Sequence, residues 1–195
     1  MKLVKQSLIP LLCLVLFACA DKQPTRLTDV TGLIPDLEFE LTDENNKKVT
    51  AENYLGSTVA IFFGFTSCPE VCPTTMHQLS SILSKIGESA KSVNVLFISV
   101  DPERDSAENL KKYTAVFGAS FIGLRGDEAV IKEMTKRYRV TFGYGEKNQQ
   151  GDYEVSHSGA VFIFDTEGKA RLLATQSSSA EDIEIDLKNL IDASN

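Results

Sequence analysis

Apolar and polar positions along this chain follow two different periods, and their alternation predicts a mixed α/β fold. Residues 58–65 and 93–100 are continuous runs of β-branched, aliphatic and aromatic side chains, with the length expected of central strands buried on both faces. Between them, residues 73–86 carry apolar side chains at helical spacing, and Gly87 follows as a stop signal. This order is typical of the centre of an α/β sheet.

Further elements flank this centre on both sides. In chain order, we predict a strand hairpin over 37–50, a helix over 106–117, a strand over 121–124, a helix over 127–138, a loose hairpin over 139–155, a clear hairpin over 160–175 and a helix over 180–191. The whole order predicts a thioredoxin-like α/β sandwich with an N-terminal β-hairpin and an inserted hairpin before the loop that carries His157.

The first residues of the chain predict export. Lys2 and Lys5 precede an apolar run over 8–17 that is too short to span a bilayer comfortably. The run ends in the letters LFAC, which resemble the lipobox of bacterial lipoproteins, in which the cysteine is acylated and becomes the N-terminus. We therefore expect residues 1–18 to be a lipoprotein signal peptide and Cys19 to carry the lipid. Ordinary signal cleavage a few residues later is the alternative.

The rest of the chain divides into a tether and one domain. Residues 19–32 are polar and lack periodicity, as in a flexible tether, and residues 33–195 have the length of a single domain. The sequence therefore predicts a thioredoxin-like domain held at the periplasmic face of a bacterial membrane through Cys19.

The net charge argues against a nucleic-acid partner. The full chain has a net charge of -7, and removing residues 1–18 takes away two basic residues and no acidic ones, which makes it -9. So acidic a surface repels a polyanion.

Cys68 and Cys72 are the only cysteines outside the first nineteen residues, and they follow the first central strand. Open α/β sheets place ligand and catalytic sites at such a corner between strand and helix. Each cysteine precedes a proline, and Pro73 suits the first position of a helix, which would make Cys72 its N-cap. Because a helix N-terminus favours negative charge, we expect the Cys72 thiol to ionise more readily than a free cysteine.

The cysteine pair is best explained by its chemistry. A disulfide that closes so small a loop adds little stability by chain entropy. Two thiols separated by three residues can close into a redox-active disulfide, or they can hold a soft metal such as Cu(I). A metal site would need a third ligand, and the chain has two histidines.

The two histidines, His77 and His157, are not equally well placed to bind a metal at the cysteine pair. His77 lies five positions after Cys72, which on a helix places it about 140° around the axis, so we expect it to be a solvated helix residue. His157 follows the loose hairpin and is flanked by small residues that leave its imidazole free to reach a site. From the residues alone, a metal ligand and an ordinary surface histidine are equally good interpretations of His157.

Three segments together resemble the SCO/SenC family of copper-binding, thioredoxin-fold proteins, in the family's order: FTSCPEVCPTT, SVDPERDSAENL and DYEVSHSGAVFIFD. The resemblance implies that Cys68, Cys72 and His157 bind copper, as Cu(I) or Cu(II). It also implies a role in delivering copper to, or reducing the cysteines of, the binuclear copper centre of cytochrome c oxidase. The implied partners are the copper-receiving subunit of that oxidase or another exported copper protein, and a thiol–disulfide reductant.

Some residues of these segments depart from the family or have an open role. Ser156 stands where the family commonly has aspartate before the histidine, and many members carry a transmembrane anchor where this chain has a lipobox. Asp101 and Arg104 match the family's DPxRD segment. Asp101 ends the strand beside the cysteine strand, so it either faces the site or belongs to a turn that enters the next helix.

Three classes of function are therefore in competition. A metallochaperone would hold copper with two thiolates and one imidazole, whereas a thiol–disulfide oxidoreductase would use one thiolate to attack a partner's disulfide and the other to resolve the intermediate. A peroxide-handling enzyme ranks last, because the peroxiredoxin pattern P-x-x-x-T-x-x-C does not fit the residues before Cys68. Copper binding alone needs His157, so this residue separates the first two classes.

Overall fold

The computed structural model describes residues 24–194. The expected signal peptide over 1–18 and the expected lipid site at Cys19 lie outside the described residues. Within 24–194, no helix is both long and apolar enough to cross a membrane.

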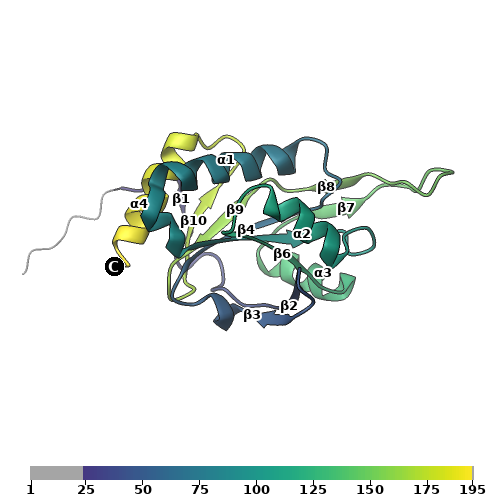
Figure 1. The fold of residues 1–195 in the computed structure, drawn as a ribbon, viewed down its shortest axis with the longest axis horizontal. Coiled ribbons are helices and arrows are strands. Elements are labelled where there is room, and N and C mark those ends of the chain that lie inside the picture. The colour runs from purple at the N-terminus through teal and green to yellow at the C-terminus, as the bar shows by residue number, and fades with distance from the viewer. Residues whose placement is uncertain (1–23, 195) are drawn as a thin grey trace, which may run out of the picture.

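Eight strands form one mixed sheet in the order β1-β10-β9-β4-β5-β6-β2-β3 (Figure 1). Strand β4 pairs in parallel with β5, which pairs in parallel with β6, whereas β9 runs antiparallel to β4. The strands of this sheet are β1 Thr28–Asp29, β2 Glu40–Asp43, β3 Lys48–Thr50, β4 Thr58–Gly64, β5 Val93–Ser99, β6 Phe121–Arg125, β9 Val161–Phe164 and β10 Ala170–Ala174.

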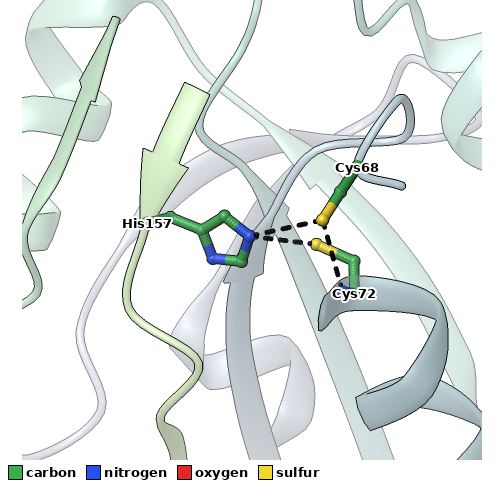
Figure 2. Close-up of side chains that lie close together, drawn as sticks. All are labelled: Cys68, Cys72 and His157. Carbon is green, nitrogen blue, oxygen red and sulfur yellow. Dashed lines mark hydrogen bonds between the residues drawn. The ribbon is translucent and has the colours of Figure 1, made fainter. Parts of the chain in front are cut away.

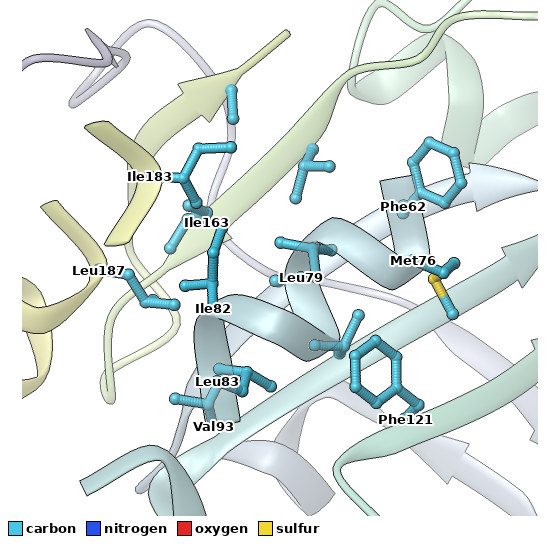
Figure 3. Close-up of a cluster of buried hydrophobic side chains, with 14 of the residues drawn as sticks. Phe62, Met76, Leu79, Ile82, Leu83, Val93, Phe121, Ile163, Ile183 and Leu187 are labelled. Carbon is cyan, nitrogen blue, oxygen red and sulfur yellow. The ribbon is translucent and has the colours of Figure 1, made fainter. Parts of the chain in front are cut away.

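Helices cover both faces of the sheet, so the predicted α/β sandwich is confirmed. The four α-helices are α1 Val71–Ile86, α2 Ala107–Ala115, α3 Glu128–Arg137 and α4 Ala180–Asp192. Side chains of α1, α2 and α4 pack into one core cluster, and those of α3 pack into the cluster on the other face. Figure 3 shows α1 and α4 meeting over the sheet through Leu79, Ile82, Ile183 and Leu187.

Strand β4 is buried at every position because both of its faces are covered. Ala60 and Phe62 belong to the cluster under α1, while Ile61 and Phe63 belong to the cluster over α3. This alternation explains why the sequence of the strand is continuously apolar. The strand therefore gives the loop that follows it a fixed starting point.

The packed part of the chain begins earlier than the sequence suggested. Strand β1 pairs with β10, and the neighbouring Leu27 and Val30 are buried. The buried carboxylate of Asp186 in α4 accepts hydrogen bonds of 2.7 Å from the backbone N–H groups of Arg26 and Leu27. A flexible tether over 19–32 is therefore wrong for residues 26–30, which edge-strand pairing and a buried acceptor hold in place.

The first hairpin also differs from its prediction. The strand expected from residue 37 begins at Glu40, because residues 36–38 are held by other partners. The Tyr138 hydroxyl donates to the Asp36 carbonyl at 3.1 Å and accepts from the Glu38 N–H at 3.0 Å. These long-range contacts use the backbone groups that a strand would have paired.

The inserted hairpin forms a second, two-stranded sheet of β7 Phe142–Tyr144 and β8 Val155–His157. In Figure 1 its tip projects away from the rest of the domain. Phe142 is paired with His157 in this sheet. The histidine is thus the last residue of a strand and not part of a loop as predicted.

Candidate metal centre

Helix α1 begins at Val71 with Glu70 as its N-cap, so the prediction that Cys72 caps this helix is wrong. Cys72 is the second helical residue and Pro73 the third. Proline is still tolerated there, because the N–H groups of the first turn have no acceptor within the helix. Cys68 lies in the preceding loop, where its N–H donates to the Phe65 carbonyl at 3.1 Å.

The fold brings both sulfurs to the imidazole of His157 (Figure 2). The His157 Nε2 atom lies 3.3 Å from Cys72 Sγ and 3.7 Å from Cys68 Sγ. The backbone N–H of Cys72 points at Cys68 Sγ at 3.4 Å. The three donor atoms lie within 4.8 Å of one another, which is close enough to share one metal ion.

Cys72 is fully buried, and its sulfur lies against the end of strand β4. A Cβ atom at Gly64 would meet Cys72 Sγ at 2.7 Å and the Phe97 ring at 2.8 Å, so only glycine leaves room for the sulfur. Burial raises the pKa of the Cys72 thiol well above its ordinary value, contrary to the expectation of easy ionisation. A thiolate at this position therefore needs a compensating cation, such as a bound metal ion.

His157 presents one ring nitrogen, Nε2, to the two sulfurs. Its Nδ1 lies 3.0 Å from the Ser158 carbonyl oxygen, an acceptor that requires the proton on Nδ1 and leaves the Nε2 lone pair facing the sulfurs. The ring packs edge-on against Phe62 and Phe65, at centroid distances of 5.9 and 5.7 Å. Burial lowers the pKa of His157, so the imidazole is neutral at pH 7 and suited to metal binding.

Asp105 is a site residue that the sequence analysis missed. Its fully buried carboxylate accepts hydrogen bonds from the Thr66 hydroxyl and the Ser99 hydroxyl, each at 2.6 Å, and from the Thr66 N–H at 3.1 Å. Burial raises the pKa of Asp105. This carboxylate anchors the loop two residues before Cys68. The sequence did offer one indication of this role, because Asp105 is the last residue of the DPERD segment.

Asp101 and Arg104 face the hairpin that carries His157. Asp101 is buried, forms an ion pair with Arg104 and accepts a hydrogen bond of 2.6 Å from the Tyr153 hydroxyl. Of the two interpretations of Asp101, the turn before the next helix is confirmed, because the Asp101 carbonyl accepts the backbone N–H groups of Arg104 at 3.2 Å and Asp105 at 3.0 Å. Its carboxylate contacts Arg104 and the hairpin residue Tyr153.

His77 lies outside the site, as predicted. Its side chain is exposed on α1 and packs edge-on against Phe117 at 4.9 Å. Among the described residues, Cys68, Cys72 and His157 form the one cluster of cysteine, histidine or acidic side chains close enough to hold a metal ion.

Known proteins are similar to this chain in sequence and in fold. The chain is 34% identical over 132 residues to the SCO2-like protein RP587 of Rickettsia prowazekii. The aligned residues are 67% of this chain and 64% of that protein, so the match spans less than two thirds of the relative's length. The structure of Bradyrhizobium japonicum ScoI with copper bound matches with a TM-score of 0.72 and 37% identity, over 80% of this chain and 98% of that one.

A plant relative has the same fold. The structure of Arabidopsis thaliana ScoI with copper bound matches with a TM-score of 0.74 and 30% identity, covering 81% of this chain and 98% of that one. Residues 33–192 match the SCO1/SenC family as a whole. With this match over most of the described residues, the chain belongs to the SCO1/SenC family.

Proposed function

We propose that this protein binds copper between Cys68, Cys72 and His157 and delivers it to, or helps assemble, the binuclear copper centre of cytochrome c oxidase. The observation that carries the proposal is the convergence of two sulfurs and one unprotonated imidazole nitrogen within 4.8 Å. Two thiolates and an imidazole are a soft donor set that suits Cu(I) and also accepts Cu(II). The similar ScoI structures with copper bound support the same metal here.

The unequal burial of the ligands suits a site that releases its metal. Cys72 is fully buried, whereas Cys68 and His157 are partly exposed. A ligand from the receiving protein would approach from the exposed side and replace Cys68 or His157 first, and Cys72 would leave last. Because each thiol must lose its proton when copper binds, copper loading releases protons and weakens as the pH falls.

The proposal includes export and attachment. We infer that cleavage after residue 18 leaves Cys19 as a lipidated N-terminus and holds the domain at the periplasmic face of a bacterial membrane, where its copper-receiving partner and a thiol–disulfide reductant would act. The lipobox-like letters LFAC support this inference.

A thiol–disulfide oxidoreductase remains the second candidate, because the two thiols differ as a nucleophile and a resolving thiol would. Cys68 is partly exposed and accepts a hydrogen bond from the Cys72 N–H, whereas Cys72 is fully buried. In this function Cys68 would attack one sulfur of a partner's disulfide and release the other as a thiolate. Cys72 would then displace the partner's remaining sulfur and leave a Cys68–Cys72 disulfide.

The substitution His157→Ala separates the two functions. It removes one copper ligand and leaves both thiols, so we expect copper affinity of the reduced protein to fall on the order of a hundredfold. The rate of reduction of a small model disulfide should stay within about threefold of the parent, since that reaction needs only the thiols. The measurements are anaerobic competition with a copper chelator and stopped-flow reduction kinetics.

His77→Ala is the matched control, because it removes the other histidine from an exposed position outside the site. It should leave both measurements unchanged. Copper binding by His157→Ala as tight as that of the parent would refute the metal site and favour the oxidoreductase.

A further inference from the structure

The hairpin β7–β8 places His157 although it has no strand pairing with the main sheet. Apart from the contacts of His157 itself, the polar contacts from residues 142–157 to the rest of the described domain go to residues 100–104, directly after β5. The position of the histidine therefore depends on how this short turn holds the hairpin.

Arg104 is the residue of this turn that contacts both the backbone and the ring of one hairpin residue. Its Nη1 donates to the Tyr153 carbonyl at 3.1 Å, and its guanidinium lies over the Tyr153 ring at 4.0 Å from the centroid. Its Nε pairs with the buried carboxylate of Asp101, which also accepts from the Tyr153 hydroxyl. The ion pair with Asp101 thus orients the Arg104 guanidinium, which contacts both the backbone carbonyl and the ring of Tyr153.

The other side of the same guanidinium leads to the site. Arg104 lies 5.6 Å from the centroid of the Phe65 ring, and this ring packs perpendicular to the imidazole of His157. Phe65 also accepts the N–H of Cys68. Tyr153, Arg104, Phe65 and His157 therefore form a chain of successive contacts from the hairpin to the donor atoms.

We propose that Arg104, together with Tyr153, is a positioning residue that holds the hairpin so that His157 Nε2 faces the two sulfurs before any metal binds. Its effect on copper rests on the proposed function, but the placement of the imidazole does not. The same turn holds the other half of the site through Asp105 and Thr66. Residues 101–105 thus set the distance between the cysteine loop and the histidine.

The first test measures placement without copper. In the reduced, metal-free protein, NMR should detect proton contacts between the His157 ring and the rings of Phe62 and Phe65. We expect Arg104→Met to lose these contacts while the resonances of β4 keep their parent pattern. Contacts that survive in a folded Arg104→Met protein would overturn the proposal.

Tyr153→Phe provides a second variant in case Arg104→Met does not fold. It removes the hydroxyl that binds Asp101 and keeps the ring beneath the guanidinium, so we expect weakened ring contacts of His157. Arg137→Met is the matched control: Arg137 also pairs with a carboxylate and a backbone carbonyl, but its partners are Glu38 and Asp36. It should leave the ring contacts unchanged, and a Tyr153→Phe protein indistinguishable from this control would count against the proposal.

The second test asks whether Arg104 acts through the histidine. Alone, Arg104→Met should weaken copper binding about tenfold, the scale typical of groups that orient a ligand. Added to His157→Ala, it should weaken binding by less than about twofold, because the ligand it positions is already absent. A full tenfold loss in both backgrounds would show that Arg104 acts on the protein generally.

Together, the two tests separate a failure of the proposed function from a failure of the positioning role. If His157→Ala alone leaves copper affinity unchanged, the proposed function fails, and the NMR ring contacts of His157 in Arg104→Met still test the positioning role. If His157→Ala weakens copper binding and neither Arg104→Met nor Tyr153→Phe does, the positioning role fails and the metal site stands.

Discussion

The two halves of the site are built in opposite ways. The cysteine half follows strand β4, which is buried at all seven positions and paired on both sides within the main sheet. The histidine half is a separate pair of three-residue strands whose side chains are half-buried or exposed. Apolar burial on both faces fixes the first half, and a few polar and ring contacts fix the second.

This difference assigns the two halves different tasks. An element buried on both faces opens only when the whole domain unfolds, whereas a peripheral hairpin with few buried contacts can open locally at much lower free energy. Under the proposed function, the cysteines would keep a constant arrangement and His157 would be the ligand that can leave and return with the hairpin. Such an asymmetry would suit a site that accepts and releases copper.

The two halves should differ most in their response to a glycine substitution, beginning with Gly64 in the cysteine half. The substitution Gly64→Ala places a methyl group 2.7 Å from Cys72 Sγ and 2.8 Å from the Phe97 ring, both inside the core, so the sulfur or the ring must move. We expect a loss of about 1–3 kcal/mol in the free energy of unfolding, the usual cost of overpacking. Urea unfolding measures it, and copper affinity should fall with it because the sulfur is displaced.

Gly143→Ala is the same substitution on the histidine half. The added Cβ there would meet its nearest neighbour, Ser156 Oγ, at 3.5 Å, an ordinary contact. We expect the free energy of unfolding to change by less than about 0.5 kcal/mol. Equal losses from the two substitutions would contradict the view that only the cysteine half is tightly packed.

Acidification should affect the histidine half of the metal-free protein first. Burial lowers the pKa of His157 below its ordinary value of 6.5, so below pH 6.5 the unfolded chain binds a proton that the folded protein resists. Stability should therefore fall as the pH drops from 6.5 towards the folded pKa, by at most about 1.4 kcal/mol per pH unit. The raised pKa of Cys72 keeps its thiol protonated in this range, so it contributes nothing.

The measurement is a pH series of urea unfolding for the parent and for His157→Gln. Both proteins have the same carboxylates, so the effect of carboxylate protonation on the free energy of unfolding cancels when the two pH series are subtracted. The parent should lose more stability than His157→Gln between pH 6.5 and 5. Parallel curves would mean that the imidazole is protonated as readily in the folded protein as in the unfolded chain.

Local patterns were enough to predict the centre of the molecule. The continuous apolar runs of β4 and β5 and the helical spacing of α1 reflect burial on both faces and one-sided packing, which the sequence records directly. The loop with Cys68 and Cys72 followed from these elements. The resemblance to SCO/SenC proteins, rather than any local pattern, singled out His157, and the fold brings it to the two sulfurs.

The remaining features depend on partners far away in the chain. Strand β1 pairs with β10, and the preceding Leu27 donates its N–H to Asp186, which lies 159 residues later in the chain. The surrounding core determines where helix α1 begins and raises the pKa of the Cys72 thiol. Arg104 and Asp105 contact the hairpin residue Tyr153 and the loop residue Thr66, and these contacts form only when the chain folds. Periodicity carries no information about such contacts.

We expect the smallest effect from a substitution in the hairpin itself, at Ser156. Ser156 precedes His157 in β8, and neighbouring strand residues point to opposite faces, so its side chain faces away from the sulfurs. It is exposed, and its hydroxyl donates only to the Gly143 carbonyl of β7 at 3.3 Å.

Ser156→Asp restores the residue common in the family. Because an exposed charge is screened by solvent and salt, we expect stability to change by less than about 0.5 kcal/mol and copper affinity by less than about threefold. Chelator competition at low and at physiological salt measures the affinity. A tenfold rise in affinity that disappears in salt would mean that the outer face of the hairpin acts electrostatically on the copper, and that the histidine half contributes more than a single ligand.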